Sequence, residues 1–204
     1  VMNDSPKPSD TRVFMRGNPG RPGKVAPRQF LKVLSGPDRK PFSDGSGRLE
    51  LARAIIGQAA PLTARVIVNR VWRWHFGEGL VDSPSDFGVR ADSPSHPDLL
   101  DDLAAGFLAD GWSIKGLHRR MMLTNAYQQA SVLRPDCEVK DARNRWLWRF
   151  NRQRLDFEAL RDSILTVSGS LDPARGGPSV PFDGASNPPR RTVYGFIDRQ
   201  NMDG

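Results

Sequence analysis

The stretch from residue 61 to residue 76, PLTARVIVNRVWRWHF, decides the fold class of this sequence. Its apolar residues recur at steps of three and four, which is the spacing of one face of an α-helix. These apolar positions are Leu62, Val66, Ile67, Val71 and Trp74. A polar stripe runs beside them at Arg65, Asn69 and Arg73. Gly77 and Gly79 then follow as helix terminators, so the pattern predicts a helix over residues 62–76.

Helical spacing continues on both sides of this stretch. Upstream, a helix is expected from about Ser46, and Pro61 is expected to close it. Downstream, Pro97 suits the first turn of a helix that Gly111 ends. The apolar face predicted for this downstream helix consists of Leu99, Leu100, Leu103, Phe107 and Leu108.

Two serine and aspartate caps predict further helices. Ser113 as N-cap places Trp112 and Leu117 at the spacing of a hydrophobic staple, which with the preceding helix makes an αα-hairpin. Asp156 caps a later helix, whose apolar positions are Phe157, Leu160, Ile164 and Val167. Residues 143–150 fit both a strand and a helix, and we favour a helix there.

The chain is therefore expected to be mainly α: a multi-helix, bundle-like domain with long Pro/Gly-rich loops and short terminal β-strands. Residues 1–47 form an extended arm with a short strand at residues 11–16, and residues 48–170 form the helical core. Residues 171–204 form a loop and a terminal strand at 192–198, which we expect to pair with the strand near Val13. The abrupt start and end suggest a fragment truncated at its C-terminus.

Composition narrows the function classes. The 204 residues carry a formal charge of +7, with 24 Arg against 6 Lys, but the Arg are dispersed rather than clustered. This dispersion, with no nucleic-acid-binding motif, disfavours nucleic acid and leaves open Arg-driven binding of an anionic polymer. The sequence shows no signal peptide and no apolar run long enough for a transmembrane segment.

Motifs for metal and covalent chemistry are absent from the sequence. Cys137 is the single cysteine, and His75, His96 and His118 have no i, i+3 or i, i+4 spacing, so neither a cofactor nor a metal site is expected. Asp86-Phe87-Gly88 matches the magnesium-binding tripeptide of protein kinases, but the companion kinase motifs are missing.

A set of polar and aromatic residues around the central helix is the candidate ligand site. Its members are Arg65, Asn69, Arg73, Trp74, His75, Asp86, Arg90 and His96. One interpretation uses carboxylates of the 82–102 loop with a Trp as a sugar platform. Another has Arg65, Asn69 and Arg73 bind loop carbonyls around Asp86 or Arg90. Trp72 and Trp74 must point to different sides of the helix, so at least one should lie in the core.

Motifs along most of the chain resemble a family. They include residues 61–72 (PLTARVIVNRVW), 75–81 (HFGEGLV), 95–101 (SHPDLLD), 112–115 (WSIK, after Gly111), 154–162 (RLDFEALRD) and 193–201 (VYGFIDRQN). In this order they resemble the planctomycete PSD-one domain, a domain of unknown function commonly found behind a planctomycete cytochrome C-type domain.

The resemblance implies an exported protein, periplasmic or on the cell surface, with haem in a companion domain. This sequence itself contains no Cys-x-x-Cys-His haem motif. The family supplies no catalytic residues to transfer. We therefore expect an interaction or scaffold domain whose partners are companion domains of the same chain. The alternatives are a module of a carbohydrate-active enzyme system acting on extracellular polysaccharide, and an anionic-polymer binder.

Overall fold

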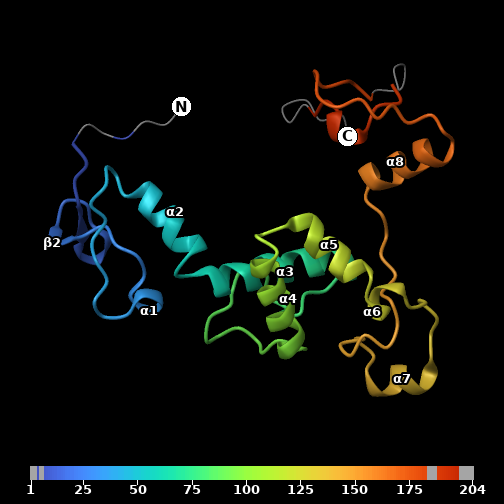
Figure 1. Ribbon diagram of the computed structural model, residues 1–204, viewed down its shortest axis with the longest axis horizontal. Helices are drawn as coiled ribbons and strands as arrows, with labels where there is room; N and C mark the ends of the chain where they lie inside the picture. Colours follow the sequence, from blue (N-terminus) through green and yellow to red (C-terminus); the bar gives the residue numbers. More distant parts are fainter. Residues whose placement is uncertain (1–3, 5–6, 183–187, 198–204) are drawn as a thin grey trace. The chain divides into compact units, whose positions relative to one another are not determined.

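A computed structural model describes residue 4, residues 7–182 and residues 188–197, and structural statements below refer to these residues (Figure 1). The chain divides into two compact units, residues 1–151 and residues 152–204. Each unit is described by itself. The predicted fold class is confirmed: the described residues are mainly helical, with one small antiparallel sheet near the N-terminus.

The described part of the first unit contains seven α-helices and a 3₁₀ turn, η1 (Met15–Gly17). The α-helices are α1 (Lys32–Ser35), α2 (Arg48–Ile56), α3 (Ala60–Phe76), α4 (Pro97–Ala109), α5 (Ile114–Met122), α6 (Asn125–Gln128) and α7 (Pro135–Lys140). The second unit contains α8 (Phe157–Val167) and a 3₁₀ turn, η2 (Thr192–Tyr194). Among the described helices, no single one is long and apolar enough to cross a membrane, although the bent pair α2 and α3, at 72°, meets the length and composition criteria together.

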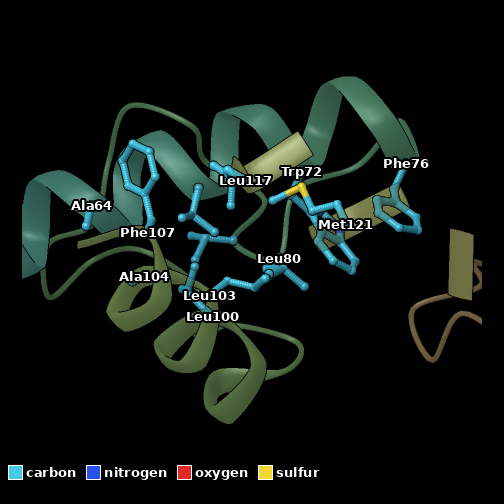
Figure 2. Close-up of a cluster of buried hydrophobic side chains, with 12 residues drawn as sticks. Ala64, Trp72, Phe76, Leu80, Leu100, Leu103, Ala104, Phe107, Leu117 and Met121 are labelled. Carbon is cyan, nitrogen blue, oxygen red and sulfur yellow. The ribbon is translucent and has the colours of Figure 1, made fainter. Parts of the chain in front are cut away.

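The core of the first unit lies where α3 packs against α4 and α5. Figure 2 shows its side chains filling the space between these helices, with Leu117 and Met121 entering from α5. Trp72 and Phe76, one turn apart on α3, stack with ring centroids 3.9 Å apart. The buried members are Ala64, Val68, Trp72, Phe76, Leu80, Val81, Leu100, Leu103, Ala104, Phe107, Leu117 and Met121.

The face that α3 buries most deeply differs from the predicted apolar stripe, although Ile67 and Val71 of that stripe are partly buried against the core. Trp74 is 82% exposed, whereas Trp72 is 2% exposed, so one of the two tryptophans is in the core as expected. The buried face consists of Ala64, Val68, Asn69, Trp72 and Phe76. Both faces of this helix carry apolar residues, and the contacts with α4 and α5 select the one with small residues near its start. Pro61 likewise lies in the first turn of α3 instead of closing α2.

The αα-hairpin of α4 and α5 is confirmed. Ser113 caps α5, its hydroxyl accepting a hydrogen bond from the Gly116 amide at 3.1 Å. Trp112 adopts a positive φ of 63° and places its ring edge-on to Phe107, at 5.3 Å between centroids. The positive φ values of Gly111 and Trp112 reverse the chain within a few residues, and the Trp112 ring stays partly buried against Phe107.

The helix expected at residues 143–150 is wrong: these residues form successive turns, and the chain has an unpredicted short helix, α7, just before them. The turns follow from the Asp141 carboxylate, which accepts hydrogen bonds from the Arg145 and Trp146 amides at 3.0 and 2.8 Å. These bonds replace the helical ladder with a local side-chain-to-backbone bond.

The predicted pairing of the arm with the tail is also wrong for the described residues. β1 (Thr11–Phe14) pairs antiparallel with β2 (Pro22–Ala26), with Thr11 opposite Ala26. In the tail, residues 192–194 form the 3₁₀ turn η2 instead of the predicted strand, and Gly195 forms an isolated bridge with Val180. Each pairing closes a shorter loop than the predicted one would, so it costs less chain entropy. Residues 198–204, which include the end of the predicted strand, lie outside the described residues.

The second unit is held by a polar clamp. Asp156 caps α8 as predicted, accepting from the Ala159 amide at 2.8 Å. Arg161, only 8% exposed, donates to the carbonyls of Pro188 and Arg190 at 2.7 and 2.8 Å, and to the Thr192 hydroxyl at 3.2 Å. The guanidinium thereby fastens the 188–192 segment to the helix through charge-assisted bonds.

Candidate functional site

The end of α3 and the loop after it are fixed by one buried amide. Asn69 is fully buried and bonds the backbone of Val81 twice: its Nδ2 donates to the carbonyl at 3.0 Å, and its Oδ1 accepts from the amide at 2.9 Å. Gly79 lets the loop approach this closely, because a Cβ there would lie 2.9 Å from the Asn69 Oδ1. Asn69 therefore supplies hydrogen-bond partners for a backbone amide and carbonyl of the loop that would otherwise be buried unpaired.

A second anchor closes the same loop near its end. The Leu80 carbonyl accepts from the amide and the hydroxyl of Ser95, at 2.8 and 3.3 Å. The Ser95 hydroxyl also lies 3.0 Å from Nδ1 of His96, and the His96 ring meets Trp146 edge-on at 5.7 Å between centroids. Residues 77–96 are thus an ordered loop whose two ends are tied back to the core.

The loop of residues 141–151 faces this anchored loop. Asn144, 2% exposed with φ 53°, donates to the Arg149 carbonyl at 2.7 Å and to Oδ1 of Asn151 at 2.9 Å. Asn151 in turn donates to the Phe76 carbonyl at 3.1 Å, which ties this loop to the end of α3. Leu147 also has a positive φ, 54°, a conformation that costs a non-glycine residue about 1 kcal/mol.

A polar hollow, here called the notch, lies between these two loops. Its polar lining includes Glu78, Asp82, Ser95, His96 and Arg145, above a floor that includes Trp72 and Phe76. The enclosed space is about 20 Å³, which holds about one water molecule and excludes a sugar ring. The notch is therefore large enough for a single small polar molecule and has Glu78, Asp82 and His96 among its lining residues.

His75, a predicted site residue, pairs with a second histidine instead of entering the notch. Its Nε2 lies 2.7 Å from Nδ1 of His118 on α5, and its ring meets Tyr127 edge-on at 5.4 Å. Burial lowers the pKa of His75, and the neighbouring His118 lowers this pKa further by charge repulsion. At 2.7 Å one ring must donate and the other accept, so the pair cannot keep this contact with both rings doubly protonated.

The other predicted site residues do not converge. Arg65 forms an ion pair with Asp101 at 2.7 Å, and the hydrogen bond from Arg65 lowers the pKa of that carboxyl. The Asp86 carboxylate accepts from the Gly88 amide at 2.8 Å, which is a local turn contact. Arg73, Trp74 and Arg90 are exposed. Of the predicted residues, His96 lines the notch.

The hypothesis that polar residues of α3 bind loop carbonyls is correct for Asn69, although its partner is Val81 rather than the region of Asp86. Arg70, which was not predicted, reaches the Pro84 carbonyl at 3.4 Å. Arg65 instead bonds Asp101 on α4. Helical spacing identified the stripe but could not assign its partners.

A larger hollow, here called the arm groove, lies between α2 and the segment that contains α1. Its volume is about 640 Å³. Its apolar lining is Phe30, Leu34, Phe42 and Ala54, and its charged lining is Asp38, Arg39, Lys40, Glu50 and Arg53. Residues 1–47 were predicted to be an extended arm, and the prediction included no hollow beside α2. The sequence feature that could have indicated this hollow is the pair Phe30 and Phe42, which lie on either side of Arg39 and Lys40 in the chain.

Metal ligation finds no support in the part of the chain that the structure describes. Within it, no three His, Cys, Asp or Glu side chains are grouped to hold a metal ion. The Cys137 thiol lies 3.7 Å from the Asp136 carboxylate.

Together, a helical core and two loops fastened by buried amides define a mainly helical module with a small polar notch. Residues 47–204 match the family PSD1, described as a protein of unknown function (DUF1553), and the chain belongs to this family. The match begins just before α2, so β1, β2 and α1 precede it. No curated protein and no solved structure matches the chain.

Proposed function

We propose that this chain is an interaction or scaffold module of an exported, haem-associated multidomain bacterial protein. The observation that carries the interaction role is an exposed apolar face on α8, here called the α8 stripe. Its members are Phe157, Leu160, Ile164 and Val167, which are 62%, 49%, 60% and 90% exposed. Export and the association with haem rest on the family resemblance described above.

The α8 stripe is the reverse of an ordinary amphipathic surface helix. Residues at steps of three and four lie on one side of a helix, and in a soluble domain such an apolar side normally faces the core. In α8 the buried residue is instead Arg161, and its neighbour Asp162 accepts from the Thr192 amide at 2.8 Å. A helix that buries its charges in a clamp and exposes its apolar side is suited to dock a partner.

A companion domain of the same polypeptide is the partner we propose. Fully burying a side chain of this kind contributes roughly 1.5–3 kcal/mol, so a four-residue stripe supplies only a modest affinity after the cost of association. Covalent linkage raises the effective concentration of a companion domain to about the millimolar range, where a modest affinity is sufficient.

The test mixes this chain with the companion domains, expressed as a separate chain, and measures binding by isothermal titration calorimetry. The variant Leu160→Glu/Ile164→Glu should lose binding by at least tenfold. The matched control is Val139→Glu on α7, because Val139 is 88% exposed and outside the stripe. Circular dichroism checks that the variants keep their helices. Equal binding by the stripe variant and the control, or no binding by the unmodified chain, would refute the proposal.

A carbohydrate role is the second candidate, and the exposure of Trp74 favours it. This indole is 82% exposed on α3, and an exposed flat ring can stack on a sugar face. If the chain serves a carbohydrate-active system, Trp74→Ala should abolish a melting-temperature increase produced by neutral polysaccharide fragments. A shift that survives in Trp74→Ala would locate sugar binding elsewhere, and no shift in the unmodified chain would remove this candidate.

A further inference from the structure

We propose that the arm groove binds a small organic anion: a carboxylate or sulfonate attached to a flat apolar body. This inference is independent of the α8 stripe, since the groove lies in the first unit. Its volume of about 640 Å³ falls within the range of pockets that enclose small molecules.

The floor of the groove is apolar and well supported. Phe30 and Ala54 are each 7% exposed and form a small core cluster, with Leu34 and Phe42 packed against it. The backbone holds this floor in place, because the Phe42 amide donates to the Arg28 carbonyl at 2.6 Å and Gln29 bridges Pro41. The floor is therefore a preformed apolar surface that includes two aromatic rings.

Three cations surround this floor. The Arg39 Nη1 donates to the Phe30 carbonyl at 2.6 Å, which fixes its guanidinium beside the floor with N–H groups to spare. Lys40 and Arg53 are exposed, and neither of them nor Arg39 forms an ion pair with a described carboxylate. Their charge is thus available for an anionic group.

The acidic residues of the lining compete only in part. Both oxygens of Glu50 accept backbone bonds, from Ser43 at 3.2 Å and from Asp44 at 3.0 Å, so this carboxylate is held at the start of α2. Asp38 is exposed and the lining keeps three cations against two carboxylates. The charge balance therefore selects an anion over a cation.

The polar groups of the lining argue against a hydroxyl-rich ligand. Ser35 and Gln58, the uncharged hydrogen-bonding side chains of the lining, bond each other at 2.5 Å. The four apolar residues of the floor offer no side-chain donors or acceptors. A sugar would leave hydroxyls unpaired against this floor, which costs free energy, whereas a flat hydrocarbon body would not.

The test titrates the full chain with 2-naphthoate and with the uncharged analogue 2-naphthol, monitoring amide chemical shifts by NMR. We expect saturable 2-naphthoate binding with shifts confined to residues 30–58. Lys40→Gln/Arg53→Gln should weaken 2-naphthoate binding at least tenfold and change 2-naphthol binding less than twofold. The matched control Lys24→Gln/Lys32→Gln removes the same charge from exposed residues outside the groove and should change neither affinity by more than twofold.

Three results would overturn the proposal. The first is no saturable 2-naphthoate binding by the unmodified chain, or binding whose shifts map outside residues 30–58. The second is an equal loss in both double variants, which would mean that net charge alone attracts the ligand. The third is preference of the groove for sulfated oligosaccharide over 2-naphthoate, which would assign it to an anionic polymer.

Discussion

Replacing Asn69 by Leu tests how the loop of residues 77–96 is held. Leucine has a similar volume, so the change removes the two hydrogen bonds to Val81 without opening a large cavity. Val81 is 3% exposed, so water does not replace the lost partner at its amide and carbonyl. Leaving a buried polar group unsatisfied costs about 1–3 kcal/mol.

The expected net effect is a loss of about 2–4 kcal/mol in the free energy of unfolding of the first unit. Two unsatisfied groups cost about 2–6 kcal/mol, and the greater apolarity of leucine offsets part of this cost. In a chain of this length, 1 kcal/mol shifts the melting temperature by about 2–4 °C, so Asn69→Leu should lower it by about 5–15 °C.

The assay is thermal unfolding followed by tryptophan fluorescence, with hydrogen exchange at the Val81 amide as a local measurement. The matched control is Arg73→Leu, one turn further along α3, where the side chain is exposed and the change should stay within about 0.5 kcal/mol. If Asn69→Leu melts with the control and the Val81 amide stays protected from exchange, the reasoning is refuted.

Three other contacts can be tested by substitution. Gly79→Ala should destabilise the first unit by about 1–3 kcal/mol, because the new Cβ would lie 2.5 Å from the Val81 carbonyl oxygen and 2.9 Å from Asn69 Oδ1. Asn69→Leu releases that carbonyl from its hydrogen bond, so the two changes together should cost less than their sum in urea unfolding. Arg161→Lys should destabilise the clamp of the second unit by about 2 kcal/mol, because an ammonium cannot reproduce the forked contacts with two backbone carbonyls. Hydrogen exchange at the residue 192 amide should become faster, and unchanged exchange would contradict the clamp. Because the folded state lowers the pKa of His75, the unfolded chain binds a proton at this residue more readily than the folded chain as pH falls below 6.5. The urea midpoint of unfolding should therefore fall between pH 7.5 and pH 5.5, which is above the range in which carboxylates titrate. His75→Phe should make the urea midpoint less dependent on pH, and an unchanged pH dependence in this variant would assign the effect to another group.

Short-range sequence patterns correctly predicted the helices whose ends depend on contacts within a few residues. Ser113 and Asp156 cap helices as expected, because an N-cap depends on a side chain and an amide three residues away. The helix predicted at residues 143–150 is not formed, because the Asp141 carboxylate accepts hydrogen bonds from two amides of this segment and turns the chain. A bond of this kind depends on the exact approach of a side chain to the backbone, which residue spacing does not report.

The candidate site shows the same division. Helical spacing singled out Asn69 as a polar residue on an apolar helix, and it correctly suggested that this residue binds loop backbone. Spacing could not show that His75 meets His118, 43 residues away, or that Phe30 and Phe42 form the floor of a groove with Ala54. These contacts join segments separated by long stretches of chain, and many such pairings are compatible with one pattern.

Residue spacing and motifs were enough to predict that this protein is mainly helical, where most of its long helices lie, and which family it resembles. Those features follow from periodicity, caps and ordered motifs, which act over a few residues. The packing between helices and loops was needed to show that α3 buries its Ala64 and Val68 side and exposes Trp74, and that α8 buries Arg161 and exposes its apolar stripe. α3 carries apolar residues on more than one side, and α8 is apolar on a side that remains exposed. Which side is buried therefore depends on the partners that pack against each helix, and those partners are set by the path of the whole chain.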